Sequence, residues 1–208
     1  MILQMFTVGR LYTNCYVVAC EQTKEAIIID PGFENRFESA KIFSFITENG
    51  LTLKLVVNTH GHPDHVCGNG IIKEKFHAPI LIHENDAYML GGLNRRDAEF
   101  FGSTEFSPSA NILLHEGDLV KIGKITLKVM HTPGHTSGSM SLIGEKEVFT
   151  GDTLFAGSIG RTDLPGSSER DMRLSLKKLA SLSDHITVYP GHGPTTTIGE
   201  EKFNNPFL

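Results

Sequence analysis

The segment 59–65, Thr-His-Gly-His-Pro-Asp-His, constrains this chain more than any other part of its sequence. It places three imidazoles and one carboxylate directly after the apolar run 53–57. Residues i and i+2 of an extended segment point the same way, so His60 and His62 can converge on one ion. Asp64 and His65 follow a proline that turns the chain toward a second position. So dense a group of polar side chains at a strand end has no packing rationale, and it predicts a metal site rather than a loop of surface histidines.

Three further ligand candidates follow strand-like runs elsewhere in the chain. His135 lies in 131–139 (HTPGHTSGS), Asp152 ends 147–152 (EVFTGD), and His192 lies in 189–194 (YPGHGP). Glycines beside each candidate permit the sharp turns that aim a side chain into a shared cleft. Seven ligands are enough for two adjacent ions: His60, His62, Asp64, His65, His135, Asp152 and His192. Imidazole with carboxylate suits Zn²⁺, and also Fe and Mn, and excludes an all-oxygen Ca²⁺ or Mg²⁺ site.

The order of expected elements indicates a layered α/β fold. Strand-like runs occupy 2–8, 14–20, 25–30, 53–60 and 78–82, with helical patterns at 37–46 and 66–76. Further strands are expected at 119–123, 124–132, 139–144, 147–152 and 186–191. A helix is expected over 168–182 with Leu174, Leu176, Leu179 and Leu182 facing inward. Strands that alternate with helices are typical of α/β layers, here expected as one domain over residues 1–208.

The segment 84–111 breaks this pattern. After a short expected helix at 84–90 it contains Gly91-Gly92 and a Phe-rich stretch, which is typical of a lid or an insertion. Tyr88, Arg95 and Arg96 in this segment could meet an anionic substrate tail, although a solvated surface is the favoured interpretation.

Composition narrows the range of partners. The sequence has 19 Lys+Arg against 24 Asp+Glu, a net charge of −5, which argues against binding a phosphate backbone. No run approaches the roughly 20 apolar residues of a membrane span, and the first residues lack the basic region of a signal peptide. Three cysteines at irregular spacing agree with a reducing compartment. We therefore expect a small-molecule substrate, no nucleic acid, no membrane partner and a cytoplasmic location; the oligomeric state stays open.

Four motifs in this order carry a family resemblance: THGHPDH, HTPGHTSGS, GDTLF and YPGHG. The chain resembles the metallo-β-lactamase fold superfamily, most nearly its hydroxyacylglutathione hydrolase (glyoxalase II)-like branch. The resemblance implies a four-layer αββα sandwich with the metal site at one edge of the two sheets. It also implies a division of the ligands: His60, His62 and His135 for one metal, Asp64, His65 and His192 for the other, and Asp152 as a bridge together with a water or hydroxide. Two Zn²⁺ are the expected cofactors, and Fe or Mn suits the same ligands.

The function implied by this resemblance is that of a metal-dependent hydrolase. A metal-bridging hydroxide would attack a thioester or small ester, with His60, His62 and Asp64 as the catalytic ligand group. The sequence contains no GxSxG nucleophile motif, which agrees with a metal-bound nucleophile. The acyl group and the thiol carrier, glutathione included, stay open.

Alternative functions share the same ligands. An iron-dependent persulfide (sulfur) dioxygenase of this fold would use His60, His135 and Asp152 as a two-His, one-carboxylate triad. A β-lactamase of this fold would usually have cysteine in place of Asp152, which disfavours antibiotic hydrolysis. The net charge and the lack of a basic patch disfavour a nuclease or phosphodiesterase. A non-enzymatic metal binder is the weakest alternative, because every expected ligand is present.

Several other residues carry weaker predictions. Asp30 either orients a ligand imidazole or forms a turn before Pro31, and the sequence favours neither. Thr59 and Thr136 could orient ligands in the same way, although capping a turn is the favoured role for both. Arg161 and Asp163 are expected to form an ion pair at the wall of the cleft, and Cys67 is expected to be a small buried residue rather than a redox-sensitive thiol. The remaining histidines, His77, His83, His115, His131 and His185, are assigned surface or structural roles.

Overall fold

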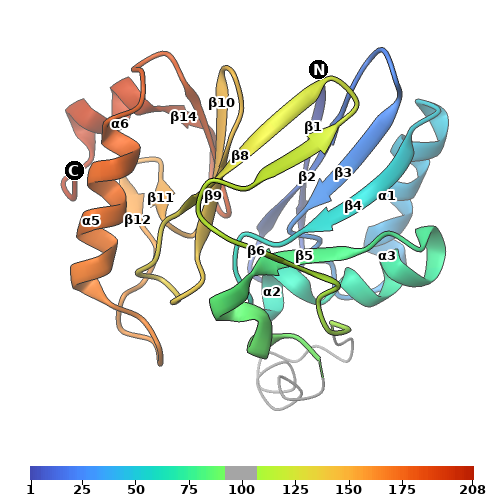
Figure 1. Ribbon diagram of the computed structural model, residues 1–208, viewed down its shortest axis with the longest axis horizontal. Helices are drawn as coiled ribbons and strands as arrows, with labels where there is room; N and C mark the ends of the chain where they lie inside the picture. Colours follow the sequence, from blue (N-terminus) through green and yellow to red (C-terminus); the bar gives the residue numbers. More distant parts are fainter. Residues whose placement is uncertain (92–106) are drawn as a thin grey trace.

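The computed structural model describes residues 1–91 and 107–208, and it shows two β-sheets packed face to face between helices. The first sheet has the order β1-β2-β3-β4-β5-β6, and the second has the order β14-β13-β10-β9-β8-β7. Figure 1 shows α1 and α3 outside the first sheet and α5 and α6 outside the second. This arrangement confirms the predicted αββα sandwich.

The strands of the first sheet are β1 (Ile2–Val8), β2 (Thr13–Ala19), β3 (Glu25–Ile29), β4 (Thr52–Val57), β5 (Ile80–His83) and β6 (Ile112–Leu114). Strands β1 to β3 form an antiparallel meander, whereas β3 to β6 run parallel. The parallel connections pass through α1 (Arg36–Glu48), α2 (Pro63–Val66), α3 (Asn69–Phe76) and a 3₁₀ helix (Glu84–Met89). The carboxyl ends of β3 and β4 therefore lie side by side.

The second sheet contains β7 (Leu119–Ile122), β8 (Ile125–His131), β9 (Met140–Ile143), β10 (Glu147–Gly151), β13 (Thr187–Pro190) and β14 (Thr196–Thr197). A small hairpin of β11 (Leu154–Phe155) and β12 (Ser158–Ile159) follows β10, and the helices of this half are α5 (Glu169–Ala180) and α6 (Ile198–Asn204). Strands β10 and β13 run parallel, whereas the other pairs in this sheet are antiparallel. Asp152 and His192 therefore leave neighbouring strands at one end of the sheet.

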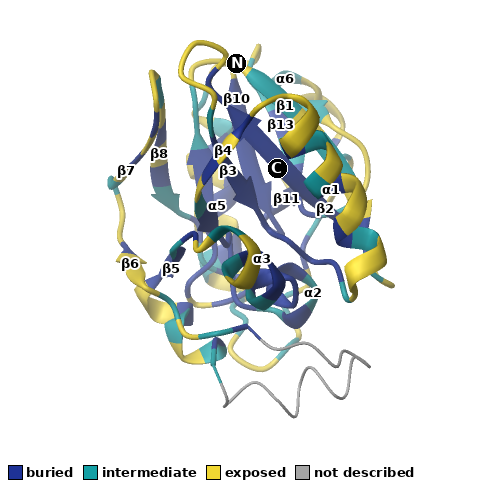
Figure 2. Ribbon diagram, turned by 90° about the vertical axis from the view of Figure 1, so that its right-hand side faces the viewer, coloured by how far each residue is buried: buried dark blue, intermediate teal, exposed yellow. Residues whose placement is uncertain are grey.

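Three apolar layers hold the sandwich together. Central strands have both faces buried, and alternate residues enter different layers: Ile28 packs toward α1 and α3, whereas Ile27 and Ile29 pack between the sheets. The third layer joins the second sheet to α5 and α6. Figure 2 shows the strands as a buried centre and the outer face of α1 as exposed.

The structure corrects one prediction for the helix 168–182. Leu176 and Leu179 pack into the third layer, and Leu182 lies partly buried against it, but Leu174 is 51% exposed. At 100° per residue, position 174 lies about 200° away from 176, so both leucines cannot face one sheet. Strands β6, β11, β12 and β14 and helix α6 were not predicted, because each is too short to establish a period.

Helix α5 therefore offers a matched pair of substitutions. Leu176→Ala should lower the free energy of unfolding by about 2–5 kcal/mol, because it opens a cavity in a layer where the side chain is 2% exposed. Leu174→Ala should change it by less than about 0.5 kcal/mol. Urea unfolding of both variants after metal removal tests the assignment of the two faces, and equal losses would contradict it.

Candidate metal centre

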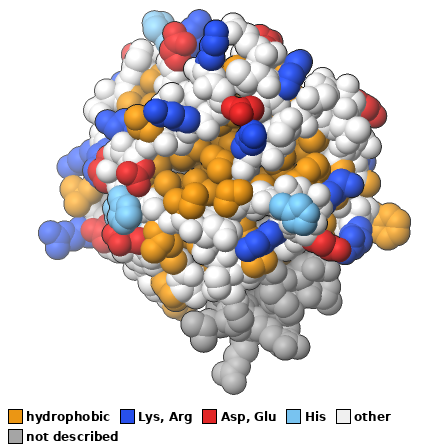
Figure 3. All heavy atoms as spheres, turned by 45° about the vertical axis from the view of Figure 1, so that its right-hand side comes forward, with side chains coloured by type: hydrophobic (Ala, Val, Ile, Leu, Met, Phe, Trp, Pro, Cys, Tyr) orange, Lys and Arg blue, Asp and Glu red, His pale blue; other side chains and the backbone are white. Residues whose placement is uncertain are grey.

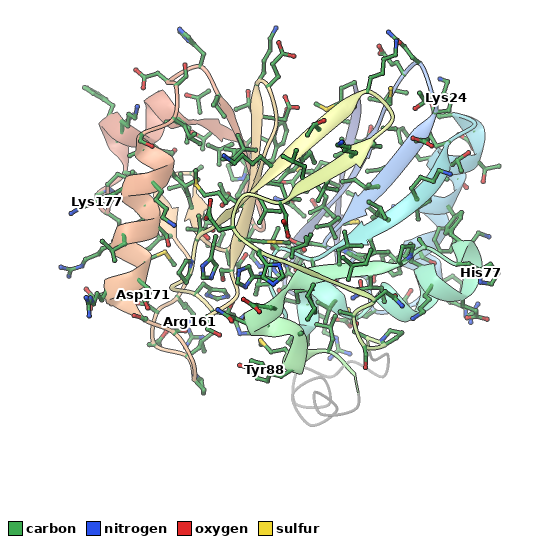
Figure 4. All side chains as sticks on the ribbon, viewed as in Figure 1. Lys24, His77, Tyr88, Arg161, Asp171 and Lys177 are labelled. Carbon is green, nitrogen blue, oxygen red and sulfur yellow. The ribbon has the colours of Figure 1, made fainter. Side chains whose placement is uncertain are left out.

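The seven predicted ligands meet at one end of the sandwich, where loops from both sheets converge. His60, His62, Asp64 and His65 follow β4 and continue into α2, His135 lies in the loop between β8 and β9, and Asp152 and His192 follow β10 and β13. Figure 4 shows nitrogen-bearing rings gathered at this end, close to the labelled Arg161 and Tyr88. Their convergence from four strand ends agrees with the geometry that the motifs imply.

The ligand atoms form three overlapping groups, and in each group they lie within 4.8 Å of one another. One group is His60, His62 and His135; a second is Asp64, His65 and His192; a third joins His60 and His65 to Asp152. The first two groups coincide with the two ligand sets implied by the family resemblance.

Asp152 lies between the two groups. Its Oδ2 atom is 3.4 Å from His135 Nε2 and 3.5 Å from His192 Nε2, and its Oδ1 atom is 3.4 Å from His65 Nε2. Gly191 makes room for it, because a Cβ atom there would lie 2.2 Å from Asp152 Oδ1. The carboxylate thus lies against ligand nitrogens of both groups.

The buried polar atoms of the centre fit a bound cation. Within residues 1–91 and 107–208, His60 Nε2 and Asp152 Oδ1 are the buried side-chain nitrogen or oxygen atoms without a hydrogen-bond partner. Leaving such an atom buried and unsatisfied costs about 1–3 kcal/mol, and both atoms point into the ligand groups. A divalent cation would satisfy both, and the mixed imidazole and carboxylate donors suit Zn²⁺, Fe or Mn.

Oxygen atoms behind the imidazoles fix their orientation. His65 Nδ1 lies 3.0 Å from Asp30 Oδ2, His135 Nδ1 2.9 Å from the Arg161 carbonyl, and His192 Nδ1 3.0 Å from the Leu11 carbonyl. Donation from Nδ1–H leaves each Nε2 as a lone-pair donor toward the centre. His62 is turned the other way, with Nδ1 2.8 Å from His135 Nε2.

Asp30 behaves as the ligand-orienting interpretation predicted. Besides contacting His65, its carboxylate accepts hydrogen bonds from the backbone N–H and the hydroxyl of Thr59, at 2.7 and 2.6 Å. The Thr59 hydroxyl is also 3.2 Å from His60 Nδ1. Thr59 therefore links Asp30 to a ligand instead of only capping a turn, which corrects that expectation. Gly151, with φ +50°, allows this contact because a Cβ atom there would lie 2.3 Å from Thr59 Oγ1.

Two residues of β2 that the sequence did not single out hold the His192 loop. Asn14 Nδ2 donates to the carbonyls of Pro190 and Gly193, at 3.0 and 2.8 Å, and the Tyr16 hydroxyl donates to Pro190 at 2.6 Å. These bonds cross from the first sheet to the second. The sequence analysis also did not single out Asp86 of the 3₁₀ helix. It is a fully buried carboxylate that accepts hydrogen bonds from the loops of His60 and His135. No motif marked these positions; only their burial in the fold distinguishes them.

The weaker sequence predictions have mixed outcomes. Arg161 and Asp163 form the expected ion pair, with two contacts of 2.9 Å, although both side chains are largely exposed. Burial raises the pKa of the Cys67 thiol, which donates to the Phe33 carbonyl, so the buried structural role is favoured. Thr136 donates to Asp86. Arg95 and Arg96 lie outside the described residues.

The histidines outside the centre have the assigned structural or surface roles. His83 and His131 stack with ring centroids 4.0 Å apart, and His131 Nε2 lies 2.9 Å from the Ser137 carbonyl. His77, His115 and His185 are exposed.

The local environment divides the centre into a neutral side and a charged side. Burial lowers the pKa of His60 well below its usual range, and burial together with His135 lowers the pKa of His62 to about 4. For His65, burial is opposed and outweighed by Asp64, Asp152 and Asp30, which raise its pKa. His192 behaves likewise, because Asp152 and Asp64 outweigh burial and raise its pKa to about 9. The imidazoles of His60 and His62 are therefore neutral near pH 7, as metal ligands must be.

These opposite shifts predict a stability maximum for the protein after metal removal. Between about pH 6.5 and pH 4, His62 is protonated in the unfolded chain but not in the folded one, so the free energy of unfolding decreases as the pH is lowered. Above pH 6.5 the extra protonation of folded His192 is lost through about pH 9, so stability also falls as pH rises. Thermal unfolding with chelator should therefore give a melting temperature that peaks near pH 6.5. His62→Ala should flatten the acid side and His192→Ala the alkaline side; a monotonic profile would contradict these environments.

Comparison with known protein families agrees with this geometry. Residues 8–192 match the family model described as the metallo-beta-lactamase superfamily. The chain is 39% identical to an uncharacterized protein of Mycobacterium tuberculosis, covering 100% of this chain and 98% of the relative. It is 37% identical to the hydroxyacylglutathione hydrolase GloC of Haemophilus influenzae, again over 100% and 98%.

Solved structures give the same answer at the level of the fold. The BLEG-1 B3 metallo-beta-lactamase aligns with a TM-score of 0.90 and 32% identity, over 100% of this chain and 99% of that one. TTHA1623 in a di-iron-bound form aligns with a TM-score of 0.87 and 34% identity, over 99% of this chain and 100% of that one. ETHE1 from Myxococcus xanthus aligns with a TM-score of 0.83 and 31% identity, over 99% of this chain and 84% of that one.

Proposed function

The chain belongs to the metallo-β-lactamase superfamily, and from its site we propose that it is a dinuclear metal-dependent hydrolase acting on a thioester or related small ester. The observation that carries this proposal is the pair of ligand groups joined by Asp152, with two buried atoms left unsatisfied among them. The GloC relative supports a thioester of the hydroxyacylglutathione class. The broader conclusion is that the chain has a metal-dependent hydrolase fold with a His and Asp cluster, and it does not depend on the choice of substrate class.

The residues of this chain would hold and orient the metal ligands, and a water activated by the bound cations would be the nucleophile. When bound, two divalent cations lower the pKa of water toward neutrality and polarise the carbonyl under attack. The residues of the chain hold the geometry: Asp152 spans the two groups, and the Arg161 carbonyl and Asp30 keep His135 and His65 in position. Thr13 Oγ1 donates to Asp64 Oδ2 at 3.0 Å, which fixes the carboxylate opposite His192.

Side chains of mixed character lie beside His192 and at the same end of the sandwich. His192 has the Phe155 ring at 5.9 Å on one side, and the exposed Leu11 supplies the carbonyl behind it. Tyr88 and Arg161 lie at the same end of the sandwich (Figure 4). Because Arg161 is already paired with Asp163, its charge is partly neutralised, so we do not assign it to an anionic substrate group.

A small-molecule substrate remains our proposal. On the face shown in Figure 3, Lys and Arg side chains of the described residues are interspersed with Asp and Glu around an apolar middle. Such a surface lacks the single-sign field that draws a phosphate backbone to a protein. No helix within the described residues is long and apolar enough to cross a membrane. A cytoplasmic location and the absence of nucleic-acid and membrane partners stay proposals.

The second candidate is an iron-dependent persulfide dioxygenase that uses His60, His135 and Asp152. The ETHE1 neighbour is the reason for keeping it, and TTHA1623 in its di-iron-bound form shows that a neighbour of this fold can hold iron. The BLEG-1 neighbour likewise makes β-lactam hydrolysis an activity to test, although Asp152 stands where a β-lactamase of this fold usually has cysteine.

Elemental analysis of the purified protein, coupled to activity assays, separates these candidates. Two zinc ions per chain with thioester hydrolysis would support the hydrolase, whereas one iron with persulfide-dependent O₂ uptake would support the dioxygenase. β-Lactam turnover without thioester turnover would replace the proposed substrate class. No turnover in any assay by fully loaded protein would overturn the enzymatic proposal.

Loss of the bridging carboxylate gives the sharpest test by substitution. Asp152→Ala, and separately His135→Ala, should reduce metal content and lower kcat/KM by more than the roughly 10–100-fold that loss of an outer partner costs. Both variants should still unfold cooperatively in thermal melts with chelator, because three apolar layers rather than ions hold the fold. His115→Ala, an exposed histidine outside the ligand groups, is the matched control. Parent-like turnover by either variant would show that its assignment is wrong.

A further inference from the structure

Asp86 is a buried carboxylate that belongs to neither ligand group. It lies in the 3₁₀ helix Glu84–Met89 after β5, and its exposure is 0%. Its Oδ2 atom accepts hydrogen bonds from the Gly61 N–H at 3.0 Å and from the Thr136 hydroxyl at 2.7 Å. Its Oδ1 atom accepts one from the Gly138 N–H at 2.7 Å. A carboxylate is an acceptor only, so three converging donors match its ionised form.

These three donors come from the two loops that carry the first ligand group. Gly61 stands between His60 and His62, and Thr136 directly follows His135. One carboxylate therefore joins a loop of the first sheet to a loop of the second. The same two loops bring His62 Nδ1 and His135 Nε2 to within 2.8 Å of each other.

We propose that Asp86 is a positioning residue that sets the spacing of His60, His62 and His135 and so controls divalent-cation binding at that group alone. The inference rests on the proposed metal centre. All three of its described hydrogen bonds come from backbone N–H groups and a hydroxyl, so it acts on where the loops lie. Asp30 differs, because it contacts the ligand imidazole of His65 directly.

Packing around Asp86 makes this placement specific. A Cβ atom at Gly138 would lie 2.5 Å from Asp86 Cγ, and one at Gly61 would lie 2.5 Å from Met89 Cβ of the same 3₁₀ helix. Asn85 and Ser137 exchange two further bonds between this helix and the His135 loop, at 3.3 and 3.4 Å. The segment is thus fitted closely against both ligand loops.

The energetic reason is the sensitivity of metal sites to ligand geometry. Ligand distances in such sites vary by only about 0.2 Å, and loss of an outer partner typically costs 10–100-fold in metal affinity. Asp86→Asn keeps the size of the side chain but replaces one acceptor oxygen by an NH₂ donor. That donor must face either Gly138 N–H or the pair Gly61 N–H and Thr136 hydroxyl, so at least one backbone donor loses its partner.

The test measures Zn²⁺ affinity at each group separately in the full chain. His192→Ala weakens the Asp64, His65 and His192 group and leaves the first group to be measured, whereas His62→Ala does the reverse. Added to His192→Ala, Asp86→Asn should weaken Zn²⁺ binding in chelator competition by about 10–100-fold. Added to His62→Ala, it should change binding by less than about threefold. This double-mutant comparison isolates the coupling between Asp86 and the first group.

Controls separate positioning from general destabilisation. Glu84→Gln, an exposed change in the same 3₁₀ helix, should leave both affinities unchanged. If Asp86→Asn does not fold, Thr136→Val removes one of the three bonds and should show a smaller loss with the same selectivity. Equal losses in both backgrounds, or no loss in the first, would overturn the role of Asp86. Failure of the unsubstituted chain to bind any Zn²⁺, Fe or Mn would overturn the metal centre and this proposal together, which distinguishes the two results.

Discussion

The burial of imidazoles and carboxylates where the two sheets meet is the constraint on which the rest of this structure depends. His60 and His65 have no exposed surface, and His135 and Asp152 have little. Such groups are costly in a protein interior unless each nitrogen and oxygen has a partner. On the outer side of the rings, the Nδ1 atoms have hydrogen-bond partners in backbone carbonyls, Thr59 and Asp30. The inner ligand atoms face one another. Among these inner atoms, His60 Nε2 and Asp152 Oδ1 have no hydrogen-bond partner, which fits a centre that binds divalent metal.

The sandwich provides the rigid support that this arrangement needs. Ligand loops leave β4 in one sheet and β8, β10 and β13 in the other, so a relative shift of the sheets would separate the ligands. Apolar packing between the sheets opposes such a shift, and polar ties cross at the ligand end itself. Asn14 and Tyr16 of β2 hold the His192 loop, and Asp86 holds the His135 loop. Local precision comes from these hydrogen bonds rather than from apolar area, because apolar packing is not directional.

Most of the fold and all seven converging side chains could be predicted from the sequence, because their signals are local. The segment 59–65 carries four ligand candidates on its own, and the long strands show their period within a few residues. The structural ties could not be predicted in this way. Asp86 lies in the sequence Glu-Asn-Asp-Ala, which resembles any solvated turn, and Asn14 is an ordinary polar residue at the start of a strand. Their roles arise from contacts with residues 50 and 176 positions away, which no short-range pattern contains.

The two ligand groups differ in charge, and this difference bears on the chemistry. The first group consists of three imidazoles, of which burial keeps His60 and His62 neutral, whereas the second contains Asp64 and has Asp30 behind its His65. Asp152 is shared. A divalent cation among neutral ligands retains more of its charge than one beside carboxylates, and in a largely buried site that charge is poorly screened. The three-histidine side would therefore be the stronger Lewis acid, where negative charge that develops on the substrate is best stabilised. Asp86 does not remove this asymmetry, because its charge is taken up by three hydrogen-bond donors from the loops of the three-histidine group.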